Sequence, residues 1–170
     1  APKTAALCTP FPARRKKAGS ARRRLFFCCS ALTTVYLPDS LEILSDGAFS
    51  NCFSLERVHI SSGTRGVTAL SFTNCPVLNL FTLDSDNELY SVKDDLLYSK
   101  DYEELVYCPP ALCEGTFTVP EGIKIIGAGV FCDRLQLTAV NLPDSLLTIG
   151  SFAFAYCSIR SIDIPASVET

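Results

Sequence analysis

The sequence repeats itself every 23 residues, and this periodicity constrains the fold more than any other feature. The stretch 37–52, LPDSLEILSDGAFSNC, returns almost unchanged at 142–157 as LPDSLLTIGSFAFAYC. The 105 positions between the two copies equal four periods of 23 plus an insertion of 13, which falls between Phe81 and Phe117. The chain therefore contains about five turns of a coil and the start of a sixth, a pattern typical of a solenoid.

One repeat predicts a short strand, a second extended segment and a turn back to the core. Over 34–37 apolar and polar residues alternate, which indicates a strand with one buried face. Pro38 ends that strand because it has no N–H group to donate. A second extended segment at 41–44 and a turn at 46–47 follow, before residues 48–49 face inward.

Stacked turns bring equivalent side chains into columns, and we expect four such columns to form the core. Two of them follow the first strand: Val35, Val58, Phe81, Phe117, Val140 and Ile162, and Leu37, Ile60, Leu83, Val119, Leu142 and Ile164. The other two follow the second segment and the turn: Leu44, Val67, Ile126 and Ile149, and Phe49, Phe72, Phe131 and Phe154. Because no single turn can bury its own apolar face, each turn depends on its neighbours.

The run at 32–52, LTTVYLPDSLEILSDGAFSNC, resembles the BspA-type leucine-rich repeat, whose turn carries IPxSVxxIGxxAFxxC. The resemblance covers about residues 32–170. It implies a leucine-rich repeat solenoid, mainly β, with short strands, irregular or short helical turns and one inserted β-hairpin unit. The insertion lies within about 84–116, and its sequence, DSDNELYSVKDDLLYSKDYEELVYCPP, is similar to an extended unit of the same family. Two turns depart from the pattern, with Ser61-Ser62-Gly63 in place of Pro-Asp-Ser and Arg134 in place of Cys, and we expect looser packing there.

Charge divides the chain near residue 31. Residues 1–31 hold eight basic residues and no acidic one, whereas 32–170 hold seven basic and 18 acidic residues, a balance of −11. The first segment has three open interpretations: a nuclear-import or nucleic-acid patch, a secretory signal that ends at Ser30-Ala31, or a disordered tail. The acidic repeat body argues against nucleic acid as its own partner. No apolar run approaches the roughly 18 residues of a membrane span.

Nine cysteines would suggest a disulfide framework in a small secreted domain, with one thiol left over. The repeat offers another explanation, because Cys52, Cys75 and Cys157 share one position in their turns. We expect these three to be buried thiols that donate weakly to loop carbonyls, although stacking could also bring sulfurs close enough to bond. Cys108 and Cys113 lack the spacing of a C-x-x-C metal or redox motif, and we expect them at the base of the inserted hairpin.

The sequence favours neither catalysis nor cofactor or metal binding. His59 is the only histidine, and its place between inward Val58 and Ile60 directs it outward from a strand, with no nucleophile indicated beside it. The acidic stretch 84–88, DSDNE, lacks the glycine and the final glutamate of a calcium loop and predicts a polar turn. No phosphate-binding loop or HExxH motif occurs. We therefore expect a non-enzymatic protein.

The outward residues of the strands form the candidate binding surface, since solenoids bind macromolecules along such faces. The candidate protein-binding residues are Tyr36, Arg57, His59, Thr82, Thr118, Asn141 and Asp163. Tyr, Arg and His side chains are frequent anchors at interfaces, so Tyr36, Arg57 and His59 are expected to contribute most.

The expected partner is a protein or extracellular-matrix ligand. Resemblance to BspA-type proteins implies a cell-surface or secreted chain with an adhesive role. Two alternatives stay open, a structural spacer and an intracellular scaffold with a basic nuclear-type tail. Because the last turn stops at IPASVET without a polar cap, we expect the chain to be a fragment of a longer repeat protein.

Overall fold

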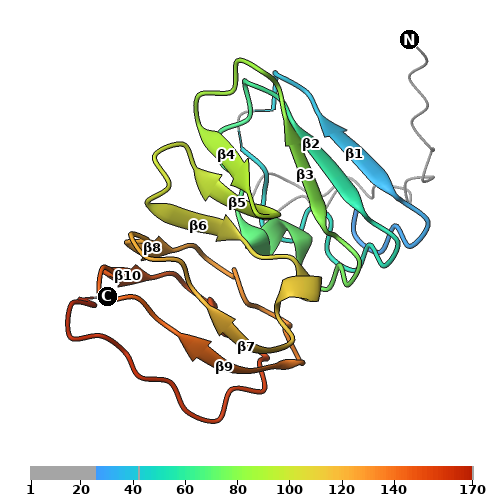
Figure 1. The fold of residues 1–170 in the computed structure, drawn as a ribbon. Coiled ribbons are helices and arrows are strands. Elements are labelled where there is room, and N and C mark those ends of the chain that lie inside the picture. Colours follow the sequence, from blue (N-terminus) through green and yellow to red (C-terminus); the bar gives the residue numbers. More distant parts are fainter. Residues whose placement is uncertain (1–25, 42, 170) are drawn as a thin grey trace, which may run out of the picture.

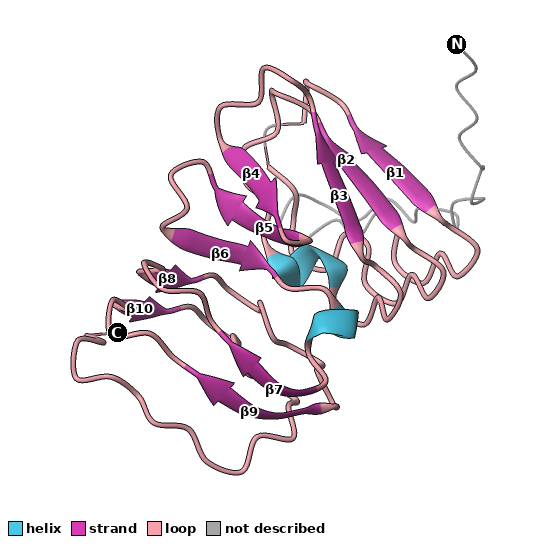
Figure 2. Ribbon diagram, viewed as in Figure 1, coloured by secondary structure: helices cyan, strands magenta, loops and turns pink. Residues whose placement is uncertain are grey.

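The chain coils into a solenoid of short strands and loops (Figures 1 and 2). The structure, a computed structural model, describes residues 26–41 and 43–169. Within these ranges the strands are two to five residues long, and the only helices are two 3-10 segments, η1 at Ala69–Phe72 and η2 at Pro110–Leu112. The expected repeat solenoid, mainly β with irregular or short helical turns, is confirmed.

The first strands of the turns stack in parallel, but in two separate sheets. β1 (Thr34–Leu37), β2 (Arg57–Ile60) and β3 (Leu80–Leu83) form one sheet, and β7 (Gly115–Thr118) and β9 (Leu137–Asn141) form the other. Each sheet keeps the predicted register, with Val35 beside Val58 and Phe117 beside Val140, all buried. The expectation of one continuous column is wrong between β3 and β7, which belong to different sheets.

The insertion separates these two sheets. It forms β4 (Tyr90–Lys93), β5 (Leu96–Ser99) and β6 (Glu104–Tyr107), which pair as an antiparallel meander. β6 then pairs in parallel with β8 (Ile125–Ile126), and β8 pairs with β10 (Thr148–Ile149). The inserted strands thus extend the row of second segments and leave the row of first strands interrupted, as Figure 1 shows.

Aromatic rings stack in the first block of turns. Phe49 lies parallel to Phe72 at a centroid distance of 5.7 Å, and Phe26 lies parallel to Phe49 at 5.1 Å. Phe26 stands one period before Phe49, so the stacked packing reaches back to the first described residue. All eight basic residues of 1–31 lie in 1–25, outside the described residues, where the three interpretations of that segment stay predictions.

The phenylalanine column does not continue directly from Phe72 to Phe131. These two rings belong to different apolar clusters, and Tyr107 of β6 packs edge-on against Phe72 at 6.1 Å. Phe131 then stacks on Phe154 at 5.2 Å. The prediction of a single column is therefore wrong at this step, because the insertion supplies the ring that follows Phe72.

Near the C-terminus the expected inward columns end early. Ile164, predicted to face the core, is 58% exposed, and Ile162 is only half-buried. The segment that follows bonds back to the preceding turn, where Ser167 donates to the carbonyl of Leu146 and Glu169 N–H to that of Leu147. Ile162 and Val168 still pack partly against the second apolar cluster, whereas the prediction of an inward side chain is wrong for Ile164.

Neither departure from the repeat pattern loosens the structure. At the first, Ser61 is buried and its hydroxyl lies 3.1 Å from that of Thr64, while Gly63 packs so closely that a Cβ there would overlap the carbonyl of Asp39. At the second, Arg134 is only 6% exposed and donates to two backbone carbonyls. The expectation of looser turns is wrong at both places.

Candidate functional site

The outward side chains of β1, β2 and β3 form a connected row. Register places Tyr36 beside His59 and His59 beside Thr82. The Tyr36 side chain is 75% exposed, and its ring centroid lies 5.7 Å from that of His59. Arg57, two residues before His59 on the same strand, is also exposed and shares this face because side chains alternate along a strand.

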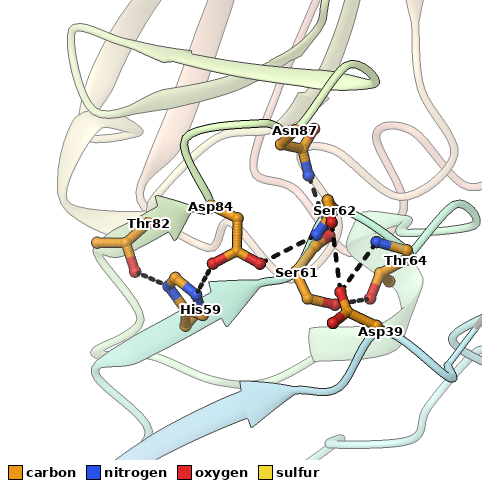
Figure 3. Close-up of polar contacts among 9 residues, drawn as sticks. Asp39, His59, Ser61, Ser62, Thr64, Thr82, Asp84 and Asn87 are labelled. Carbon is orange, nitrogen blue, oxygen red and sulfur yellow. Dashed lines mark hydrogen bonds and ion pairs between the residues drawn. The ribbon is translucent and has the colours of Figure 1, made fainter.

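The His59 ring is fixed at both nitrogens. Nδ1 lies 2.8 Å from the Thr82 hydroxyl, and Nε2 lies 2.9 Å from Oδ1 of Asp84 (Figure 3). In the neutral ring, Nε2–H can donate to the Asp84 carboxylate while Nδ1 accepts from Thr82. Both contacts reach residues of the next turn, so neighbouring repeats hold the ring still.

A polar network at the ends of these strands supports Asp84 (Figure 3). Its Oδ2 accepts a hydrogen bond of 3.2 Å from the backbone N–H of Ser62. On the other side of Ser62, Asp39 accepts from the Ser62 hydroxyl and the Gly63 N–H at 3.4 and 3.3 Å. Asn87 closes the network by donating to the Ser61 carbonyl at 3.1 Å. The candidate face therefore rests on a rigid base that links three turns.

Sequence reasoning did not identify these supporting residues. Asp84 and Asn87 belong to the acidic stretch 84–88, whose sequence predicts a polar turn, and the structure gives both a structural role. The side-chain Oδ1 of Asn87 accepts from the backbone N–H groups of Leu89 and Tyr90, which fixes the start of β4. The spacing of 25 residues between His59 and Asp84, close to one period, is the sequence signal that relates them.

The structure does not bring all seven predicted residues together. Thr118 and Asn141 lie on the second sheet, where the Asn141 amide donates to the Thr118 hydroxyl at 3.0 Å. Asp163 is exposed and lies in no strand. The predicted strip is thus two patches and an isolated residue, separated by the strands of the insertion (Figure 1). Only the β1–β3 patch, which holds Tyr36, Arg57, His59 and Thr82, combines aromatic and charged groups.

The hydroxyl–imidazole–carboxylate order of Thr82, His59 and Asp84 also occurs in hydrolases. Such enzymes add oxyanion donors and a substrate cleft beside the hydroxyl. Here the hydroxyl projects from the middle of a strand on an open face. Two hollows among the described residues, one beside η2 and the other among the loops that include Asn51 and Tyr156, are not lined by Thr82, His59 or Asp84.

The repeated cysteines contact carbonyl oxygens, as predicted, but only Cys52 and Cys75 are buried, and Cys157 is partly exposed. The thiols of Cys52, Cys75 and Cys157 lie 3.2, 3.1 and 2.8 Å from carbonyl oxygens of Phe26, Phe49 and Phe131. In every case the carbonyl is 26 residues upstream. Arg134 keeps the same relationship, since its Nη2 donates to the Cys108 carbonyl at 2.7 Å. Burial raises the pKa of Cys157, in keeping with a neutral thiol that donates.

Two observations limit the kinds of site that the described residues can form. No group of three or more His, Cys, Asp or Glu residues among them is placed to hold a metal ion. None of the helices in the described part of the chain combines the length and the apolar character that crossing a membrane requires.

Known structures share this fold. The crystal structure of the pneumococcal vaccine antigen PcpA matches with a TM-score of 0.61 and 24% identity, covering 81% of this chain and 40% of that one. A leucine-rich cell surface protein from Faecalibacterium prausnitzii gives 0.61 and 24%, covering 85% and 45%. A leucine-rich repeat protein from Eubacterium ventriosum gives 0.57 and 18%, covering 85% and 51%. The chain thus spans about half or less of the length of each of these proteins.

No curated protein matches the sequence. A family model does, the BspA type leucine-rich repeat region, with six copies over residues 17–109 and 113–170. The gap in this match, 110–112, coincides with η2. Since these repeats span most of the sequence and the solenoid has the architecture of leucine-rich repeat proteins, the chain belongs to the family of BspA type leucine-rich repeat proteins.

Proposed function

We propose that the chain is a non-enzymatic protein-binding module that engages a protein or extracellular-matrix ligand through the β1–β3 patch. The observation that carries the proposal is the exposed Tyr36 ring against an imidazole fixed at both nitrogens. A side chain already held in place loses little entropy on binding, so more of its contact energy contributes to affinity. Arg57 adds a cation to the same surface, and Tyr and Arg are the types that anchor interfaces.

A cell-surface or secreted location is part of the proposal. It is supported by the family to which the repeats belong and by the description of the Faecalibacterium relative as a cell surface protein. Surface labelling of intact cells that express the tagged protein tests the location. Labelling confined to lysed cells would favour the alternative of an intracellular scaffold.

Binding is tested by measuring affinity for a panel of purified extracellular-matrix and cell-surface proteins with biolayer interferometry. The combined variant Tyr36→Ala, Arg57→Ala and His59→Ala should weaken binding to any ligand found by about tenfold or more. The matched control, Thr116→Ala, Thr118→Ala and Asn141→Ala on the second sheet, should change affinity by less than about twofold. Near-ultraviolet circular dichroism confirms that both variants stay folded.

Two results would contradict the proposal. A loss confined to the second-sheet variant would move the site away from β1–β3. Binding by neither the wild type nor its variants to any panel member, in a protein found at the cell surface, would favour a spacer that presents another domain.

A further inference from the structure

The segment CPPALC, residues 108–113, brings two buried thiols together outside the proposed binding patch. The Sγ atoms of Cys108 and Cys113 lie 3.0 Å apart, and the residues are 0% and 1% exposed. We propose that Cys108 and Cys113 form an intrachain disulfide when the protein meets a low-molecular-weight disulfide such as oxidised glutathione. This inference is independent of the binding patch and of its ligand.

The thiols of Cys52 and Cys75 also interact with each other, but the pair differs from the repeated cysteines in its nearest partners. Cys52, Cys75 and Cys157 each lie within 3.2 Å of a carbonyl oxygen on a neighbouring turn. The nearest polar partner of Cys108 is the sulfur of Cys113, since the Pro109 carbonyl is farther away at 3.8 Å. A disulfide bond of about 2.0 Å therefore requires a movement of about 1 Å between the two sulfurs.

A buried guanidinium lies beside this pair and favours the thiolate that disulfide exchange needs. Arg134 donates to the carbonyls of Cys108 and Cys132, and its guanidinium lies 5.5 Å from the ring centre of Tyr107. These partners are neutral, so none of them compensates the positive charge. The hydrogen bond from Cys108, together with the Arg134 charge, lowers the pKa of the Cys113 thiol against the opposing effect of burial.

The oxidant reaches the pair through η2, the 3-10 segment Pro110–Leu112, which has no buried residue. Opening this segment uncovers Cys113 without removing apolar side chains from the core. The Cys113 thiolate attacks one sulfur of the oxidant, forms a mixed disulfide and expels one thiolate. Cys108 then loses its proton and attacks the Cys113 sulfur, which expels the second thiolate. The protein is oxidised by two electrons, and one oxidised glutathione becomes two reduced molecules.

The disulfide would fix the segment that connects β6 of the insertion to β7. Closing this six-residue loop restricts the unfolded chain, and the thermal midpoint should rise by about 5 °C on oxidation.

Trypsin offers a direct test, because one peptide, residues 101–124, holds Cys108 and Cys113 and no other cysteine. The folded protein is incubated with oxidised glutathione, blocked with N-ethylmaleimide, digested and analysed by mass spectrometry. We expect this peptide to lack maleimide and to be lighter than its reduced form by two hydrogen atoms. Bonds within the pairs Cys52 and Cys75 or Cys132 and Cys157 would instead join two peptides. The proposal would be overturned if peptide 101–124 carried maleimide on both cysteines, or if the only disulfides found were those that join two peptides.

Three variants separate the formation of the disulfide from the activation of the Cys113 thiol. Cys113→Ser should abolish both the mass loss and the rise in thermal midpoint. Arg134→Gln keeps an N–H donor for the Cys108 carbonyl and removes the charge, so oxidation at neutral pH should slow by about tenfold, while Arg134→Lys should restore part of the rate. An unchanged rate in Arg134→Gln would overturn the role of the guanidinium. The peptide measurement on the wild type decides on the bond even if neither Arg134 variant folds.

Discussion

The regular turns and the junction beside the insertion, the turn that contains Arg134, use different side chains to bind an equivalent backbone carbonyl. In the regular turns Cys75 lies 3.1 Å from the Phe49 carbonyl, and at the junction Arg134 donates to the Cys108 carbonyl at 2.7 Å. Both carbonyls stand 26 residues upstream of their donors. The comparison teaches that this repeat position is defined by a carbonyl that needs a donor, and that either a thiol or a guanidinium can supply it.

The same contrast appears in the aromatic core. Phe72, in the regular block, contacts the rings of Phe49, Phe81 and Tyr107 and is 1% exposed. Phe154, at the other end, stacks on Phe131 alone among the ring contacts described and is half-buried. A buried residue flanked on both sides should therefore contribute more to stability than an equivalent one near the end.

The largest expected effect tests this difference. Phe72→Ala should lower the free energy of unfolding by about 3–5 kcal/mol, because it removes a fully buried ring and leaves a cavity. Phe154→Ala should cost about 1–2 kcal/mol, in proportion to its partial burial. Urea denaturation followed by circular dichroism measures both. Phe152→Ala, at a side chain that is 67% exposed, serves as the control and should change stability little. Equal losses of unfolding free energy in Phe72→Ala and Phe154→Ala would contradict the expected difference between a ring flanked on both sides and one near the end.

The second prediction concerns Arg134→Cys, which places at the junction the side chain found in the regular turns. Arg134→Cys should lower the free energy of unfolding by about 2 kcal/mol, because a short thiol cannot bond both the Cys108 and the Cys132 carbonyls that the guanidinium reaches. The control, Cys75→Ser, keeps a short hydrogen-bond donor at the equivalent position of a regular turn. It should lower the free energy of unfolding by less than Arg134→Cys does. Urea denaturation under reducing conditions excludes effects of disulfides. A stable Arg134→Cys protein would show that the junction needs no long donor.

The smallest effect concerns Glu104, on the inserted strand β6. Burial, and then the nearby Asp101, raise the pKa of the Glu104 carboxyl. Between its ordinary pKa and the raised value, the folded protein binds more protons than the unfolded one, so this group's contribution to stability falls as pH rises through that window. Glu104→Gln should therefore stabilise the protein at pH 7, by about 0.5 kcal/mol or less, and the gain should vanish below about pH 4.

The control for this change is Glu103→Gln, which removes a partly exposed ion pair with Lys124. That substitution should be neutral or slightly destabilising at pH 7. Thermal unfolding at a series of pH values distinguishes the two. A loss of stability in Glu104→Gln at pH 7 would show that the carboxylate is stabilising in the fold.

Much of the fold could be predicted from the sequence because the repeat specifies local geometry. Val35 and Leu37 alternate with polar residues and are buried, and the 23-residue spacing sets Val35 beside Val58. The carbonyl-binding role of the cysteines followed from the same spacing. The candidate patch was predictable only in part: Tyr36, His59 and Thr82 line up within one block of uninterrupted turns.

The sequence by itself determined the length of a turn, the inward face of the first strand in each regular turn and the position of the insertion, since these depend on contacts between neighbouring turns. Only the tertiary structure decided that the insertion joins the row of second segments through the pairing of β6 with β8, and so divides the strand face in two. It also decided that Asp84 binds His59 and that Arg134 replaces a cysteine. The physical reason is that the 13 added residues break the 23-residue period. The partner of an inserted strand or of a nearby carbonyl then depends on which backbone N–H and C=O groups of other turns lie close to it without a hydrogen bond.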